Sequence, residues 1–176
     1  MTQQQKTAPK GAIDQVGECL SCIIHAFAEA DPTAENFMAK WDIKDGFWRM
    51  DCAKGEEWNF AYVLPQPEGE PIKLVVPTSL QMGWVESPPY FCTATKTARD
   101  VTTEYIEQPV GTLQLHKFGK YIVGDPEVDA LPESGDTANG FLYTVKVYID
   151  DFMSLVIPIS REQLRHVTMT TATIQY

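Results

Sequence analysis

Two β-rich runs separated by two aspartates constrain the fold of this chain most. Residues 142–149 (LYTVKVYI) and 152–157 (FMSLVI) are rich in β-branched and aromatic residues, and only Asp150 and Asp151 lie between them. Two such runs joined by two residues are typical of a tight antiparallel hairpin. Aspartate suits the turn because it tolerates left-handed backbone geometry. The sequence therefore predicts a β-hairpin with two acidic side chains at its tip.

Other segments show helix or strand patterns. Residues 13–28 carry apolar residues at spacings of three and four, which predicts an amphipathic helix with one buried face made of Ile13, Val16, Leu20, Ile23, Ile24 and Phe27. Residues 37–43 read as a strand, and residues 58–64 and 72–76 as a second hairpin around a Pro- and Gly-containing loop.

Two further helices are expected in the second half of the chain. One runs from Ser87 to about Ile106, with Ser87 as its N-cap and prolines in the first turn. The other begins at Ser160, where Gln163 completes a capping box. The threonine-rich residues 168–176 are not expected to extend that last helix, because β-branched residues lower helix propensity.

These elements define the expected domain organisation. Residues 1–11 read as a disordered tail, residues 12–167 as one domain, and residues 168–176 as a truncated tail. Within the domain, residues 109–140 form a long acidic connection, with one short strand near residues 120–123. The predicted architecture is α+β: an antiparallel sheet of three to four strands with helices packed on one face, and the strand of Asp42 beside the hairpin.

Composition narrows the classes of partner and compartment. The chain has 176 residues and a formal net charge of −10. A surface of this sign repels polyanions on average, so nucleic acid binding needs a local site, bound cations or additional protein regions. No apolar run approaches the roughly 20 residues of a membrane-spanning helix. With four cysteines and no export signal, a reducing, intracellular compartment is expected.

Asp42 provides a second clue to function, because it stands at the end of its own apolar strand. If that strand pairs beside the hairpin, its carboxylate meets those of Asp150 and Asp151. Clustered carboxylates offer the hard oxygen ligands that Mg²⁺ prefers. Two such ions about 3.5–4 Å apart can hold the attacking and leaving oxygens of a phosphoryl transfer.

Three segments that carry these acids resemble the palm motifs of reverse transcriptases. Residues 42–48 (DIKDGFW) resemble the first motif, in which a metal-binding Asp precedes a second Asp by three positions. Residues 82–88 (MGWVESP) are similar to the second motif, a glycine turn that leads into a Ser-Pro helix start. Residues 148–151 (YIDD) are similar to the YxDD box. The segments follow the family's order, and residues 82–91 look most like retrotransposon enzymes.

The resemblance implies roles for the acidic residues. Asp42, Asp150 and the main-chain carbonyl of Ile43 would hold Mg²⁺, for which Mn²⁺ can substitute. Asp151 would support these ligands or bind a metal ion itself. Tyr148 would touch the primer end. The implied reaction is RNA-directed DNA synthesis from deoxynucleoside triphosphates on a primed RNA or DNA template.

It also implies a nucleotide site. Asp45 and Gly46 would lie near the incoming triphosphate, and Phe47 would stand beneath the sugar and reject a 2′-hydroxyl. Phe47 as an ordinary core aromatic is the alternative. Gly83 would let the backbone pass close to the nucleotide. Met82 departs from several retroviral relatives, which carry Gln there, and so removes a polar contact.

The resemblance covers about residues 12–167, which correspond to the palm and a little of the fingers. The basic fingers residues that grip the triphosphate, the thumb and the RNase H region have no counterpart here. The chain is therefore expected to be part of a longer retroelement polyprotein, and its isolated polymerase activity to be weak or nil.

Two other functional classes remain open. The chain could be a decayed or repurposed palm that serves only as an interaction module, or a metal-dependent nuclease that uses the same carboxylates. The nuclease would leave the glycine turn and Phe47 without a role. A CxxC pair, Cys19 and Cys22, has His25 three residues on and could suggest zinc. Its mid-helix position and the lack of a second CxxC favour a structural role.

Overall fold

The chain folds into a mixed α+β structure, as the sequence predicts. This computed structural model describes residues 9–109, 142–158 and 160–175. Within them, three α-helices, α1 (Asp14–Glu29), α2 (Ser87–Ile106) and α4 (Arg161–Gln175), surround a three-stranded antiparallel sheet. The strands of that sheet are β1 (Phe37–Asp42), β4 (Leu142–Tyr148) and β5 (Asp151–Ile157).

The predicted hairpin and its neighbouring strand are both present. The strand order is β1-β5-β4, so β1 lies directly beside the second strand of the hairpin. One detail of the prediction is wrong. The pairing of Tyr148 with Asp151 leaves Ile149 and Asp150 as the two turn residues, and Asp151 is the first residue of β5. The turn starts one residue earlier because Ile149, rather than an aspartate, takes the left-handed conformation, with φ of 59°.

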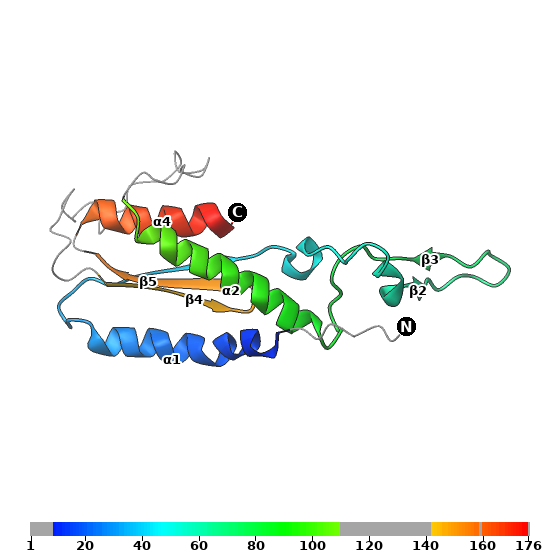
Figure 1. Ribbon diagram of the computed structural model, residues 1–176, viewed down its shortest axis with the longest axis horizontal. Helices are drawn as coiled ribbons and strands as arrows, with labels where there is room; N and C mark the ends of the chain where they lie inside the picture. Colours follow the sequence, from blue (N-terminus) through cyan, green and yellow to red (C-terminus); the bar gives the residue numbers. More distant parts are fainter. Residues whose placement is uncertain (1–8, 110–141, 159, 176) are drawn as a thin grey trace.

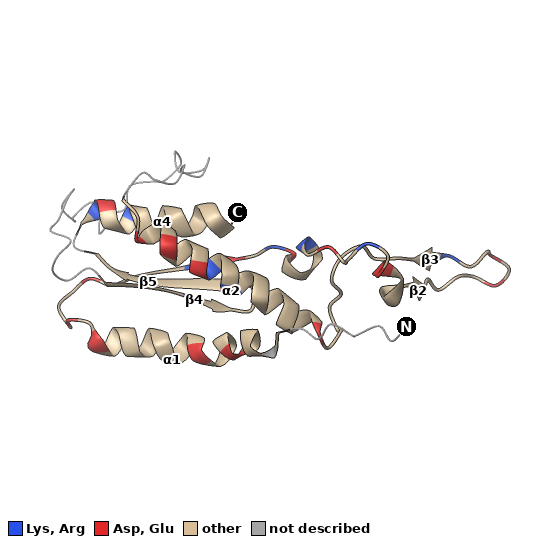
Figure 2. Ribbon diagram, viewed as in Figure 1, with Lys and Arg blue, Asp and Glu red and all other residues tan. Residues whose placement is uncertain are grey.

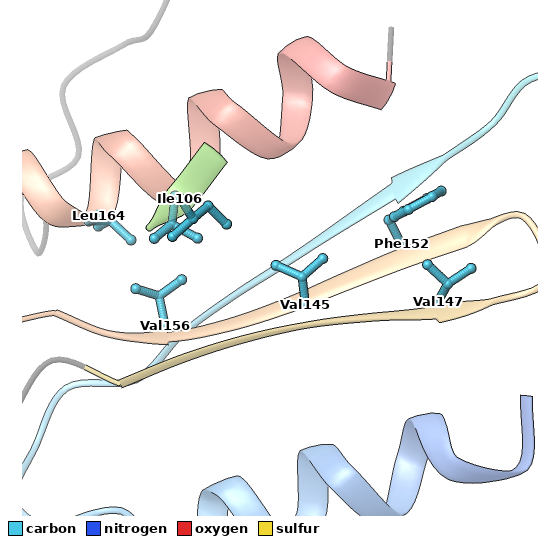
Figure 3. Packing of buried hydrophobic residues seen from close by; sticks show 7 residues of the cluster. Ile106, Val145, Val147, Phe152, Val156 and Leu164 are labelled. Carbon is cyan, nitrogen blue, oxygen red and sulfur yellow. The ribbon is translucent and has the colours of Figure 1, made fainter. Parts of the chain in front are cut away.

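Helices cover both faces of the sheet, which corrects the expectation of helices on one face. In Figure 1, α1 runs along one side of the sheet, and α2 and α4 lie on the other. The face toward α2 and α4 carries the main apolar core. Its buried residues are Ile106, Val145, Val147, Phe152, Val156, Leu164 and Val167 (Figure 3). The helices divide between the faces because strand residues alternate, and both faces of β5 are apolar enough to need a cover.

Helix α2 has the predicted limits, but its start is built differently. Ser87 is the first helical residue and Glu86 takes the N-cap position, with no side-chain capping hydrogen bond. The buried Ser87 hydroxyl instead donates to the carbonyl of Gln81 at 2.6 Å. Prolines 88 and 89 occupy the first turn, where a missing N–H costs nothing.

Helix α1 forms where expected, and Ile23 is buried as predicted, but much of the predicted apolar face is exposed. Gln15, Cys19 and Ile23 are buried, whereas Leu20 and Ile24 are exposed. The Gln15 side-chain amide donates to the Cys92 carbonyl at 3.1 Å and to the Thr95 hydroxyl at 3.3 Å. These bonds to α2 fix the rotation of α1, so a polar residue lies inside and apolar residues lie outside.

The ends of the predicted domain also differ in places. Residues 10–13 form a short 3-10 helix, η1 (Lys10–Ile13), so the predicted tail ends before residue 10 in the described part. At the other end, the Ser160 hydroxyl oxygen accepts a hydrogen bond from the backbone N–H of Gln163 at 3.3 Å, as the capping box predicts. Helix α4 then continues through the threonines to Gln175, so 168–175 is helix rather than a tail. Residues 110–141, with the predicted connection and strand 120–123, lie outside the described residues.

The segment between β1 and α2 projects from the sheet as an arm, defined here as residues 43–86 (Figure 1). It contains the 3-10 helices η2 (Gly46–Arg49) and η3 (Glu57–Phe60). The second predicted hairpin is present in shorter form, as β2 (Tyr62–Val63) paired with β3 (Leu74–Val75). None of the helices in the described residues has the length and apolarity to cross a membrane.

Candidate metal centre

Three carboxylates from two distant segments of the sequence meet at one end of the sheet. Asp42 ends β1 and pairs in register with Asp151, the first residue of β5. The Ile43 amide donates to the Asp150 carbonyl at 3.1 Å, which ties the hairpin turn to the end of β1. One carboxylate oxygen from each of Asp42, Asp150 and Asp151 lies within 4.8 Å of the other two. The expected convergence of these acids is therefore present.

The hairpin turn that carries Asp150 has an unusual backbone. Ile149 has a φ of 59°, a region that a β-branched side chain rarely adopts because its Cβ crowds the backbone. Such strain persists only where surrounding interactions hold it. Here the ladder on both sides of the turn and the Ile43 bond to Asp150 supply them. The geometry keeps the Asp150 carboxylate beside Asp42.

Lys40 is part of this acidic cluster, although the sequence reasoning passed over it. Its Nζ lies 2.9 Å from Asp151 Oδ2. The hydrogen bond to Asp151 raises the pKa of Lys40 above its ordinary value, and the charges of Asp42 and Asp150 raise it further. The two-residue period of β1 contained the signal, since Lys40 and Asp42 share a face of the strand. Asp151 thus has a cationic partner within the protein itself.

The donor set fits a hard divalent cation. Three carboxylates can offer several oxygen ligands, and Asp42 is exposed while Asp150 and Asp151 are half-buried, so an ion can reach them. The ammonium group of Lys40 is the competing cation. Asp151 can therefore bind an ion only by sharing or exchanging its ion pair with Lys40.

The first group of expected nucleotide residues follows directly after β1. Asp45 takes a left-handed conformation, with φ of 59°, and caps η2. Gly46 is buried, and a Cβ at this position would lie 2.5 Å from the Phe91 ring. Phe47 is half-buried and stacks on Phe91 with ring centroids 4.6 Å apart. Gly46 and Phe47 thus form the joint between the arm and α2, a packing role that sequence reasoning did not assign to Gly46.

The remaining expected residues lie on exposed surface. Met82 is 70% exposed, and Gly83 adopts a positive φ of 93° in the turn that precedes α2. Tyr148 ends β4 beside the turn and is 41% exposed. Because Tyr148 pairs with Asp151, the sheet places this residue, expected at the primer end, next to the carboxylates.

The CxxC segment does not form a metal site in the described part of the chain. Cys19 is fully buried, whereas Cys22 and His25 line an open groove of about 450 Å³ between α1 and β4. The His25 ring nitrogen Nδ1 lies 2.6 Å from the Ser21 carbonyl of its own helix. Among the described residues, the aspartate cluster is the one group with metal-ligand geometry.

Comparison of the chain with protein-family models, with curated proteins and with solved structures found no match.

Proposed function

We propose that this chain is the palm portion of a reverse transcriptase of retrotransposon type, which performs template-directed nucleotidyl transfer with Mg²⁺. The other parts of the polymerase would belong to a longer polyprotein. The observation that carries the proposal is the meeting of Asp42, Asp150 and Asp151 within 4.8 Å at the end of an antiparallel sheet. The family resemblance assigns metal binding to the same residues.

The arrangement of strands gives each acid a defined task in this proposal. Asp42 and Asp150 would hold the cations, as the family resemblance implies, while Asp151 is in an ion pair with Lys40. Asp151 supports them and is oriented by Lys40. When bound, Mg²⁺ would activate a primer 3′-hydroxyl and neutralise the triphosphate charge. Asp42 and Asp151 stand on paired strands, and Asp150 stands in the tight turn that the Ile43 amide ties to β1, which suits catalysis by positioning.

The arm would supply the nucleotide side of the site. Phe47 stacks on Phe91, so its ring is held in a fixed orientation beside the end of β1. A fixed flat ring can exclude a 2′-hydroxyl by contact alone. Met82 and Gly83 lie on exposed surface before α2, where a template or nucleotide can reach the backbone.

A second candidate function is favoured by the Lys40 ion pair. A decayed palm that binds no metal would need an internal counter-charge for its acidic cluster, and Lys40 already provides one for Asp151 at 2.9 Å. In that case the chain would act only as an interaction module.

Metal titration separates the two functions. We expect the wild-type chain to bind Mn²⁺ in a calorimetric titration and Mg²⁺ to compete for the same site. Asp42→Asn and Asp150→Asn should each weaken Mn²⁺ binding by at least about tenfold, since removal of a ligand costs more than removal of an outer partner. Asp51→Asn, on the exposed arm, is the matched control and should bind like wild type.

Lys40→Met sharpens the role of Asp151. If Asp151 ligates the ion, removal of the competing ammonium group raises Mn²⁺ affinity, and if Asp151 only supports, the affinity stays or falls. A wild-type chain that binds no Mn²⁺ would overturn the polymerase proposal and leave the interaction module. With metal bound, extension of a primed template by deoxynucleoside triphosphates then tests the reaction itself, and weak extension is expected from the isolated palm.

A further inference from the structure

Helix α1 presents a row of large apolar side chains to solvent. The row, called here the apolar row, consists of Ile13, Leu20, Ile24 and Phe27, which are 39–66% exposed. Their spacings of seven, four and three residues place them on one side of the helix. Single exposed apolar residues are ordinary on protein surfaces, but a periodic row on one helix is not scattered. At 1.5 Å per residue, the row is roughly 21 Å long.

The apolar row cannot turn inward, because a different side of α1 is already fixed against the rest of the molecule. Cys19 and Ile23 are buried, and Gln15 donates two hydrogen bonds to α2. A rotation that buried Leu20 and Ile24 would break those bonds and expose Cys19. The exposure of the apolar row is therefore a consequence of the packing of α1.

Two further rows lie beside the apolar row on the outer face of α1. The next row is made of small exposed residues, Gly17, Ser21 and Ala28. Apart from its chain neighbours and the adjacent backbone of α1 itself, none of the described residues comes within 4 Å of a Cβ built at Gly17, so another backbone has room to approach there. Beyond it lies the acidic row, Asp14, Glu18 and Glu29, all exposed, with His25 between them. Ser21, His25 and Glu29 stand at the edge of the outer face, where they also line the groove toward β4 and Lys146. Helix α1 contains no lysine or arginine, and Figure 2 shows acidic colour without basic colour along it.

We propose that the outer face of α1 is a docking surface for a basic amphipathic helix of another protein. The apolar side of that helix would cover the apolar row, and its backbone would pass over Gly17. Its lysines or arginines would face the acidic row, as charged flanks do in paired helices. The arrangement of apolar, small and acidic rows thus specifies both the orientation and the charge of the partner.

Charge argues against the other occupants of such a face. A second copy of the chain would bring a net charge of −10 against −10, with no basic residue on its own α1. An anionic membrane or a nucleic acid would meet the acidic row with the same sign. A basic helix is the occupant for which the charges are complementary.

A peptide titration against the full chain tests this proposal. The probe is a fluorescent 18-residue helical peptide, of a length matched to the row at about 1.5 Å per residue, with a leucine stripe and lysines along one flank. Its matched partner has glutamates in place of the lysines. We expect the basic peptide to bind at least about tenfold tighter in fluorescence anisotropy, because the charged flank selects the partner.

Variants of α1 locate the binding. The double variant Leu20→Ser/Ile24→Ser should lower the affinity for the basic peptide by at least about tenfold. Gly17→Trp should lower it to a similar extent, whereas Gly17→Ala should leave it unchanged. Ile72→Ser on the arm is the control for an equally exposed apolar residue, and it should bind like wild type. Glu18→Lys with Glu29→Lys should reverse the preference toward the glutamate peptide. All these positions are exposed, so circular dichroism and thermal unfolding should remain near those of wild type.

Several results would overturn the proposal. Equal binding of both peptides, or unchanged binding to the Leu20→Ser/Ile24→Ser chain, would exclude this surface. If the chain sediments as a dimer and Gly17→Trp dissociates it, the occupant of this surface is a second copy of the chain. If the chain cosediments with phosphatidylserine vesicles and Gly17→Trp abolishes this, the occupant is a membrane. The titration uses neither metal nor nucleotide, so its outcome is independent of the proposed polymerase function.

Discussion

The sheet and the arm of this molecule differ in how far their large apolar side chains are buried. In the sheet, Val147, Phe152 and Val156 are at most 2% exposed. In the arm, large apolar side chains of similar kind remain largely in solvent, with Trp58 at 65% and Ile72 at 77%. The metal cluster belongs to the first region, and most expected nucleotide residues belong to the second. The candidate metal ligands thus stand at the end of the well-packed sheet. The expected nucleotide residues stand on the arm, where Gly46 and Phe47 pack against Phe91 but Met82 is exposed.

The base of the arm is nevertheless fastened to the rest of the molecule. Phe47 stacks on Phe91 of α2, and Trp84 stacks on Tyr90 of the same helix. Within the arm, the Leu80 amide donates to the Met50 carbonyl at 2.8 Å. The Cys52 amide donates to Thr78 at 2.8 Å. Beyond these contacts, the β2–β3 pair consists of two residues from each strand. The tip of the arm is thus held by this short pair, whereas its base packs on α2.

The largest expected effect comes from the centre of the sheet. Phe152→Ala removes a fully buried ring at the junction of β5, β1 and β4, and should lower the free energy of unfolding by about 3–5 kcal/mol. Trp58→Ala on the arm removes a larger side chain and should change it by less than about 0.5 kcal/mol. Urea unfolding followed by circular dichroism measures both. Similar losses for the two variants would mean that the arm is packed as tightly as the sheet.

A smaller effect is expected at the joint between the two regions. Gly46→Ala places a Cβ 2.5 Å from the Phe91 ring, and should cost about 1–3 kcal/mol of unfolding free energy through overpacking. The same measurement on Gly46→Ala combined with Phe91→Leu should show less than the sum of the two single losses. Gly17→Ala, where the added methyl meets open space, is the control and should be neutral or stabilising. Additive losses at Gly46 and Phe91 would show that the joint does not depend on this contact.

The sequence predicted most of what local patterns can determine. The β-rich runs around Asp150 identified the hairpin, and the apolar strand before Asp42 supplied its neighbour, because alternation and turn chemistry act within a few residues. The resemblance to palm motifs then supplied the reason to bring Asp42 and the hairpin together. The ion pair of Lys40 was missed because a charged strand residue is ordinarily assigned to solvent.

Tertiary packing decided the features that the sequence could not. Of the buried face predicted for α1, Ile23 is buried but Leu20 and Ile24 are exposed, and Gln15 lies inside with two hydrogen bonds to α2. Ser87 was predicted to be the N-cap of α2, but its hydroxyl donates instead to the carbonyl of Gln81, earlier in the chain. In both cases a polar group found a partner on another segment, which no periodicity reveals.

The smallest expected effect compares a thiol of the α1–sheet packing with a thiol of the arm. Burial raises the pKa of Cys19 above its ordinary 9.0, and Cys22 and Asp151 raise it further, while Lys146 lowers it. A thiol whose pKa is higher in the folded state contributes stability below about pH 9, and this contribution is lost as the pH rises through the folded-state value. Urea unfolding between pH 7 and pH 10.5 should therefore show a falling free energy, and the fall should be shallower in Cys19→Ala.

Cys52 provides the comparison on the arm. Burial also raises its pKa, followed by the charges of Glu57 and Asp51, but its side chain is half-exposed whereas Cys19 is fully buried. In the native chain, a thiol reagent at pH 8 should therefore modify Cys52 rapidly and Cys19 only after local opening, since access as well as thiolate content limits the reaction. Equal rates at the two thiols would show that α1 opens as readily as the arm, and the distinction between a rigid sheet and a loosely held arm would not extend to the helix that covers its second face.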